Sequence, residues 1–217
     1  MKRCLMLDVD GVLINGRPED GRSWATDIER DLGIPLEKLS SVFFAPHWED
    51  IVSGRKNLLD TVEACLPLLA PGLTAIELID YWFSRDSRID ESLLQECDEL
   101  RRRDTHIFLA TNQEHMRAEH LMERLELEKH VDGIIYSAKI GARKPQPAFF
   151  EAASRLSGFA PANILLVDDT KANVEAAVQA GWRAEHWFGN GSLLSLVDRA
   201  YEPAEEIPSR RVDQHQE

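Results

Sequence analysis

Short apolar runs that end abruptly in polar residues are the feature of this sequence that most restricts its fold. Residues 5–7, 107–110 and 164–167 are such runs, and an Asp or a Thr follows each of them directly. Runs this short, without alternating polar residues, are typical of parallel strands that are covered on both faces. Residues 134–136 repeat the pattern, and residues 184–187 are a weaker candidate for a further strand.

Helical patterns separate these predicted strands. We expect helices over residues 114–127, 147–156 and 172–180, and the last is followed by Gly181, a residue favoured in the left-handed conformation just past a helix end. Alternating strands and helices predict an α/β fold with a doubly wound, mostly parallel sheet. Ligands bind beyond the carboxyl ends of the strands in such sheets, and that is where the polar residues lie.

Residues 16–102 interrupt this alternation, because they contain several amphipathic helical patterns and no convincing strand. We therefore expect a helical cap at 16–102, inserted into a catalytic core formed by residues 1–15 and 103–201. Such a cap would lie above the site at the end of the first strand. Residues 202–217 are rich in Glu, Pro, Arg and Gln and are expected to form a flexible tail.

Composition excludes several classes of partner. The 217 residues carry a net charge of −13, which disfavours nucleic acid and anionic membranes as partners. No apolar stretch approaches the ~20 residues that span a bilayer, and no signal-peptide core follows the first residues, so we expect a cytoplasmic monomer or homodimer. The 3 cysteines have no metal-type spacing and are expected to be buried, reduced thiols.

The sequence DVDGV at residues 8–12 places two carboxylates at the end of the first predicted strand. Asp8 is a candidate nucleophile that would attack phosphorus and form an aspartyl phosphate. Asp10, just past the strand, could donate a proton to the leaving oxygen and later accept one from water. Gly11 would allow the chain to turn sharply. The alternative is an ordinary Asp-Gly turn.

Asp168 and Asp169 end another predicted strand. Two adjacent carboxylates beside Asp8 would repel one another strongly unless a divalent cation joined them. Ligands that are all oxygen favour Mg²⁺. The alternative is that one of the pair caps the following helix, and Asn173, one turn along, could hydrogen-bond back to the pair.

Thr111, Asn112 and Lys144 are candidates for holding a phosphate group. Thr111 and Asn112 follow a predicted strand and offer a hydroxyl and backbone N–H groups, although either could simply cap a helix. Lys144 precedes a proline in a loop that could face the same crevice, and most lysines are solvated surface residues. Arg143 is the alternative cation if Lys144 faces away.

In this order, the DVDGV, Thr-Asn, Lys-Pro and Asp-Asp pieces resemble the four motifs of the haloacid dehalogenase superfamily of hydrolases. The helical insertion resembles the C1-type cap of its subfamily I. The resemblance implies that Asp8 is the nucleophile and Asp10 the acid and base, and that the following residues bind phosphate: Thr111, Asn112 and Lys144. It also implies a magnesium site formed by Asp8, the main-chain carbonyl of Asp10, Asp169 as a direct ligand, and Asp168 nearby or through water.

Asp10 decides the expected subclass, since dehalogenase members of the superfamily lack the second aspartate. The resemblance therefore implies a Mg²⁺-dependent phosphatase that acts on a small phosphorylated metabolite through an aspartyl phosphate. A sugar phosphomutase is the nearest alternative, because it forms the same intermediate. A phosphoacceptor or binding protein without turnover is an alternative of a different class.

Overall fold

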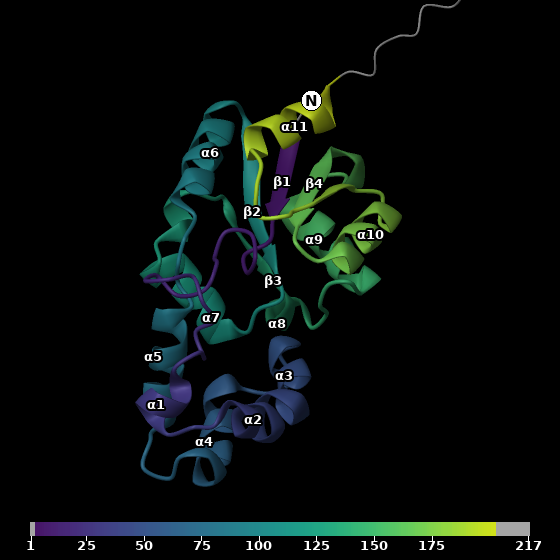
Figure 1. Ribbon diagram of the computed structural model, residues 1–217. Coiled ribbons are helices and arrows are strands. Elements are labelled where there is room, and N and C mark those ends of the chain that lie inside the picture. The colour runs from purple at the N-terminus through teal and green to yellow at the C-terminus, as the bar shows by residue number, and fades with distance from the viewer. Residues whose placement is uncertain (1–2, 203–217) are drawn as a thin grey trace, which may run out of the picture.

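A single parallel sheet forms the centre of the protein. The structure is a computed structural model that describes residues 3–202, and Figure 1 shows the sheet above a separate group of helices. Its strand order is β3-β2-β1-β4-β5, and all four neighbouring pairs are parallel. The strands span β1 (Arg3–Leu7), β2 (Thr105–Thr111), β3 (Gly133–Tyr136), β4 (Ile164–Asp168) and β5 (Arg183–His186).

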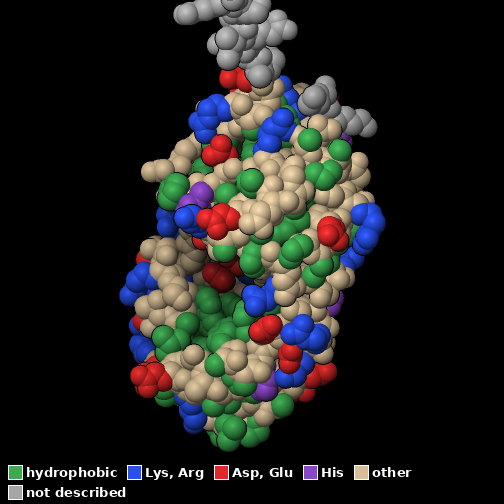
Figure 2. Space-filling view, turned by 90° about the vertical axis from the view of Figure 1, so that its right-hand side faces the viewer, with side chains coloured by type: hydrophobic (Ala, Val, Ile, Leu, Met, Phe, Trp, Pro, Cys, Tyr) green, Lys and Arg blue, Asp and Glu red, His purple; other side chains and the backbone are tan. Residues whose placement is uncertain are grey.

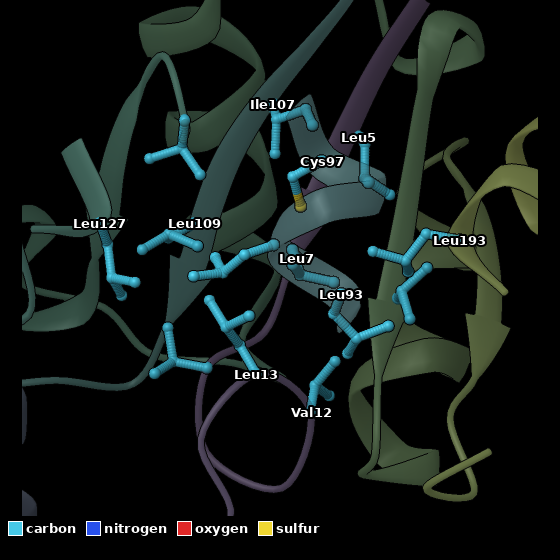
Figure 3. Packing of buried hydrophobic residues seen from close by; sticks show 14 of the residues in the cluster. Leu5, Leu7, Val12, Leu13, Leu93, Cys97, Ile107, Leu109, Leu127 and Leu193 are labelled. Atoms are coloured by element: carbon cyan, nitrogen blue, oxygen red, sulfur yellow. The ribbon is translucent and has the colours of Figure 1, made fainter. Parts of the chain in front are cut away.

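Helices cover both faces of this sheet, as the uninterrupted apolar strands predict. Leu5 and Leu7 of β1 belong to one hydrophobic cluster, with α6 (Glu91–Arg102) and α11 (Leu193–Tyr201). Figure 3 shows this cluster, in which Cys97 and Leu193 lie beside the strands. Met6 faces the opposite side, where α9 (Pro147–Ser157) and α10 (Lys171–Gln179) pack. The fold is the predicted doubly wound α/β sheet.

Short helical segments between the strands complete this core. They are α7 (His115–Glu119), the π-helical turn η2 (His120–Arg124), α8 (Ser137–Ile140) and the 3-10 turns η3 (Leu127–Lys129) and η4 (Pro161–Asn163). The helix predicted over 114–127 is thus shorter, because Glu126 adopts a left-handed conformation with φ of 56°. A side chain is disfavoured in that conformation inside a helix.

A second hydrophobic cluster belongs to the inserted helices and includes Ile28, Phe43, Leu58 and Trp82. These helices lie beyond the carboxyl ends of the strands in Figure 1. They are α1 (Ile28–Leu32), α2 (Leu36–Leu39), the π-helical turn η1 (Ser40–Phe44), α3 (Ala45–Val52), α4 (Leu58–Leu69) and α5 (Ala75–Arg85). Their separate interior supports the expectation of a cap.

The helix α6 differs from the other inserted helices. Asp90 caps its N-terminus, and the Asp90 carboxylate accepts hydrogen bonds from the N–H groups of Ser92 and Leu93. Its buried face packs on the sheet and not on the cap cluster. We therefore propose that the cap ends before α6, earlier than residue 102, because the apolar stripe of α6 completes the core.

Several other expectations can be compared with the structure. All 3 cysteines are free and buried, and the five predicted strands are present within about one or two residues of their expected ends. Among residues 3–202, no helix is long and apolar enough to cross a membrane. The predicted tail at 202–217 lies outside the described residues, apart from Glu202.

Candidate active site

The register of the sheet brings the predicted site residues to one edge. Leu7, the last residue of β1, pairs with Leu109 of β2 and with Val167 of β4, and these two strands run on to Thr111 and Asp168. The N–H of Asp8 continues the ladder by donating to the carbonyl oxygen of Val167 at 3.0 Å. Asp8 therefore leaves β1 between the last residues of its two neighbouring strands, as expected for a site at the carboxyl edge.

Asp8 is buried and held by two donors on the same oxygen. Its Oδ1 accepts a hydrogen bond from the N–H of Val9 at 2.8 Å and lies 3.0 Å from Nζ of Lys144. Its Oδ2 accepts no hydrogen bond from any of residues 3–202. Burial raises the pKa of Asp8 to about 7, with Lys144 opposing the shift and Asp168 adding to it. One oxygen is fixed while the other stays open.

Lys144 lies inside the protein, with a side chain that is 0% exposed. Its Nζ lies 2.5 Å from Oδ2 of Asp168 as well as near Asp8. Burial alone would lower the pKa of Lys144, but the two carboxylates outweigh it and the pKa is raised. The lysine is therefore charged and shared between two acids, and Arg143 does not take its place.

Asp168 is fully buried and its oxygens are occupied by protein donors. Oδ1 accepts from the N–H of Thr170 at 2.8 Å and from Nδ2 of Asn173 at 3.0 Å, while Oδ2 contacts Lys144. The predicted hydrogen bond from Asn173 is thus present. These contacts make Asp168 a positioning residue for Lys144 and leave Asp169 as the more open member of the pair.

Asp169 is exposed, and Gly11 makes room for its carboxylate. A Cβ atom placed on Gly11 would lie 2.1 Å from Oδ2 of Asp169, and Gly11 has a φ of 80°. Among the described residues, the only side-chain donor to this carboxylate is the Thr170 hydroxyl, which reaches Oδ1 at 3.2 Å. Gly11 therefore allows both the turn after β1 and the close approach of Asp169.

Gly11→Ala is expected to weaken Mg²⁺ binding at these carboxylates, because the new methyl group would displace the Asp169 carboxylate. We expect the dissociation constant for Mg²⁺, measured by calorimetry, to rise about tenfold or more. Gly158→Ala is the matched control, since Gly158 has a φ of 76° and no atom within 4 Å of the added Cβ. An equal loss of Mg²⁺ affinity in both variants would contradict the role given to Gly11.

Asp10 opens onto the space between the core and the cap and accepts a hydrogen bond from Nε2 of Gln113 at 2.5 Å. Part of the Asp10 side chain is exposed, but the surrounding protein desolvates its carboxyl group, and this desolvation raises the pKa of Asp10 to about 6. The charge of Arg117 lowers this pKa and that of Asp86 raises it. A raised pKa suits a carboxyl group that must carry a proton.

Gln113 is a site residue that sequence reasoning missed. It is 3% exposed and lies two residues past the end of β2, directly after the Thr-Asn pair. Its distance of 103 residues from Asp10 along the chain hides the contact. Its place beyond a strand end in the same sheet was the only signal that could have indicated it.

Thr111 and Asn112 occupy different positions. Thr111 is the last residue of β2 and is buried, and its hydroxyl makes no hydrogen bond within the described part of the chain. The side chain of Asn112 instead binds the backbone of Lys144, accepting from its N–H at 2.8 Å and donating to its carbonyl at 3.0 Å. Because the side-chain amide of Asn112 positions the lysine loop, we expect the main chain of Asn112, and not its side chain, to contact phosphate.

The acidic residues meet in a way that suits a divalent cation. One carboxylate oxygen from each of Asp8, Asp168 and Asp169 lies within 4.8 Å of the others. Three carboxylates face one ammonium group, so an additional positive charge would balance the site, and an all-oxygen donor set fits Mg²⁺. Among residues 3–202, the Asp10 carboxylate does not belong to this group of three carboxylates.

A comparison with known families agrees with this geometry. The model for haloacid dehalogenase-like hydrolases matches residues 2–181. The chain belongs to this family. It is therefore a hydrolase of the haloacid dehalogenase-like group, and the resemblance of the four motifs is confirmed.

Two curated relatives of this haloacid dehalogenase-like hydrolase are phosphatases. The phosphorylated carbohydrates phosphatase of Thermotoga maritima is 22% identical over 88% of this chain and 89% of its own length. The N-acylneuraminate-9-phosphatase of Rattus norvegicus is 23% identical over 70% of this chain, which covers 58% of the rat protein. Their names describe those proteins and indicate a phosphatase branch of the family.

A solved structure supports the fold. A haloacid dehalogenase family enzyme from Bacteroides thetaiotaomicron, crystallised with magnesium and inorganic phosphate, has a TM-score of 0.74 and 17% identity. The match covers 90% of this chain and 99% of that one. At this identity the similarity establishes a shared fold, including the inserted segment.

Proposed function

We propose that this hydrolase is a Mg²⁺-dependent phosphatase that acts on a small phosphate monoester through an aspartyl phosphate at Asp8. The observation that carries the proposal is the way in which the two oxygens of the Asp8 carboxylate are hydrogen-bonded. Val9 and Lys144 both hold Oδ1, and Oδ2 is left without a donor among residues 3–202. A nucleophile needs such a fixed orientation with one free oxygen.

The first half of the proposed reaction transfers the phosphoryl group to the enzyme. Oδ2 of Asp8 forms a bond to phosphorus while the bond from phosphorus to the ester oxygen breaks. Asp10 donates its proton to that departing oxygen, and Gln113 orients the Asp10 carboxyl group by donating a hydrogen bond to its Oδ2. The ammonium of Lys144 and the hydroxyl of Thr111 are placed to bind the phosphoryl oxygens.

The second half releases phosphate to water. Water attacks the phosphorus of the aspartyl phosphate, the bond to Oδ2 of Asp8 breaks, and Asp10 accepts the proton from the attacking water. The same carboxyl group thus serves as acid and then as base. The two halves together return Asp8 and Asp10 to their starting states.

Asp8, Asp169 and the main-chain carbonyl of Asp10 would hold Mg²⁺, with Asp168 behind them. When bound, the cation supplies positive charge that keeps Asp8 ionised and offsets the charge of the phosphoryl group. The proximity of the three carboxylates supports this assignment.

The carboxyl group at position 10 favours phosphoryl transfer over dehalogenation. A departing halide needs no proton, whereas an alkoxide does. The hydrogen bond from Gln113 gives Asp10 a defined orientation for that task. The phosphatase names of the two relatives support the same branch.

Release of inorganic phosphate from a panel of small monoesters tests the proposal. With Mg²⁺ we expect turnover of at least one ester, loss of activity in EDTA to below about one thousandth, and recovery when Mg²⁺ is restored. Formation of isomers from hexose phosphates without free phosphate would instead indicate a phosphomutase. Full activity in EDTA would contradict the metal site.

A further inference from the structure

Four aromatic side chains of the cap form one continuous cluster, named here the cap rings: Trp24, Phe44, Trp48 and Trp82. The rings of Trp24 and Trp82 stack at 4.9 Å with an angle of 20° between them. Phe44 and Trp48 each lie 5.5 Å from Trp82, and they lie 5.6 Å from each other. Trp82 is buried, but the other three remain partly exposed.

The elements that carry the cap rings contact the core on one side near Lys144. Ser137, just past β3, donates from its hydroxyl to the carbonyl oxygen of Val52, at the end of α3, at 2.5 Å. Arg143 lies 3.9 Å from Glu49 of the same helix. Glu49 directly follows Trp48, so the helix that carries this ring contacts the loop that carries Lys144.

A second contact lies on the side of Asp10. The buried guanidinium of Arg117 donates to the carbonyl oxygen of Phe83 at 3.3 Å and to that of Asp86, at the end of α5. Met116 packs against the hydrophobic cluster of the cap. Phe83 directly follows Trp82, and Arg117 lies one turn beyond Gln113, the residue that holds Asp10.

The cap rings therefore extend between two anchors that flank the carboxyl edge of the sheet. Figure 2 shows a hollow on this face with acidic and basic side chains at its core side and hydrophobic side chains along its cap side. The phosphate-binding groups lie on the core. The cap side of the hollow faces these groups, and the part of the ester beyond the phosphate must fit there.

Several polar side chains of the cap are paired with one another. Arg55 and Lys56 both bind Asp50, at 2.8 and 2.9 Å. The hydroxyl of Tyr81 donates to Asp31 at 2.9 Å. A polyhydroxyl group needs several hydrogen-bond partners when it loses water, whereas a flat apolar group needs none and gains from ring contacts.

We infer that the cap rings recognise an aromatic or otherwise flat, apolar leaving group, so that arylalkyl phosphates are preferred to sugar phosphates. The inference rests on the proposed phosphatase function and names its substrate class. Trp48 is the residue through which it is best tested, because it is partly exposed and lies beside the anchor near Lys144.

The test compares three phosphates of primary alcohols, so that the chemistry of the leaving oxygen is matched: naphthylmethyl phosphate, ethyl phosphate and a hexose phosphate. We expect kcat/KM for naphthylmethyl phosphate to exceed that for the hexose phosphate by about tenfold or more. Trp48→Ala should lower the ratio of kcat/KM for naphthylmethyl phosphate to kcat/KM for ethyl phosphate about tenfold. Trp48→Phe should keep most of the preference.

Leu36→Ala is the matched control, because Leu36 is an exposed apolar residue of the cap, 56% accessible, outside the ring cluster. It should leave all three activities unchanged, and urea unfolding verifies that each variant is folded. A preference for the hexose phosphate, or an equal loss for all three esters in Trp48→Ala, would overturn the inference.

Binding of naphthylmethyl phosphonate, measured by calorimetry, keeps the test independent of turnover. If the wild type binds the phosphonate and the affinity falls about tenfold in Trp48→Ala, the result supports recognition of the leaving group by the cap rings. This holds even if no ester is hydrolysed, and in that case only the proposed phosphatase function fails. Absence of binding to the wild type would overturn the inference. Hydrolysis of ethyl phosphate without such binding would leave the phosphatase function intact.

Discussion

Asp8→Asn is expected to lower the turnover of every phosphate ester by about 10⁴-fold or more, because an amide cannot attack phosphorus as a carboxylate does. The substitution preserves the size of the side chain and its acceptor for the N–H of Val9. It also leaves Lys144 paired one to one with Asp168. The fold should therefore persist, and phosphate release measures the loss.

The free energy of unfolding gives a second readout for the same variant. Burial raises the pKa of folded Asp8 from its ordinary 3.8 to about 7, so the folded state holds a proton that the unfolded state releases. Without metal, wild-type stability should fall as the pH rises between these values, and the decline should be smaller in the Asn variant, where only other groups such as Asp10, whose pKa is raised to about 6, still contribute to it. Retained turnover in Asp8→Asn would contradict the nucleophile assignment.

Lys144→Met is expected to lower both activity and stability. Its removal leaves Asp8 and Asp168 buried without a cation, and breaking a buried ion pair on one side costs about 3 kcal/mol or more. Activity should fall about 10³-fold, because the charge that binds the phosphoryl oxygens is lost. Urea unfolding in EDTA and phosphate release in Mg²⁺ measure the two effects separately.

Arg143→Met is the matched control for the lysine. Arg143 is the adjacent cation, and its contact with Glu49 at 3.9 Å is a partly exposed pair of small energetic value. We expect activity to stay within a few-fold of the wild type. If Arg143→Met lost as much activity as Lys144→Met, the neighbouring arginine would be the phosphate-binding cation.

The strands were predictable because their apolar runs are uninterrupted and end at polar residues. Leu7 and Val167 are buried in a sheet that is covered on both faces, and Asp8 and Asp168 are the first polar residues after them. A parallel sheet then places these carboxylates at one edge without any further information. That is why the fold, and the proximity of Asp8 to Asp168, followed from the pattern.

Contacts between distant segments were not predictable in the same way. The hydrogen bond from Gln113 to Asp10 joins residues 103 positions apart, and nothing local distinguishes this glutamine from a surface residue. The helix α6 has the same amphipathic pattern as the cap helices, so periodicity could not show that its apolar face covers the sheet.

The orientations of several side chains also could not be predicted from the sequence. Asn112 was expected beside phosphate, but its amide forms two hydrogen bonds with the backbone of Lys144, since the lysine loop passes within reach. Of the cap aromatics, Trp82 is buried, whereas Trp24 and Trp48 remain partly exposed, because burial depends on how the inserted helices meet.

Trapping the phosphoenzyme tests the central claim most directly. Asp10→Asn should slow hydrolysis of the aspartyl phosphate, since the amide cannot accept a proton from the attacking water. After acid quenching of the variant mixed with a reactive ester, mass spectrometry should find one added phosphoryl group on the peptide that contains Asp8. The group should be absent from the Asp8→Asn, Asp10→Asn double variant. A phosphoryl group on another residue, or its persistence in the double variant, would contradict the assignment of Asp8 as the nucleophile.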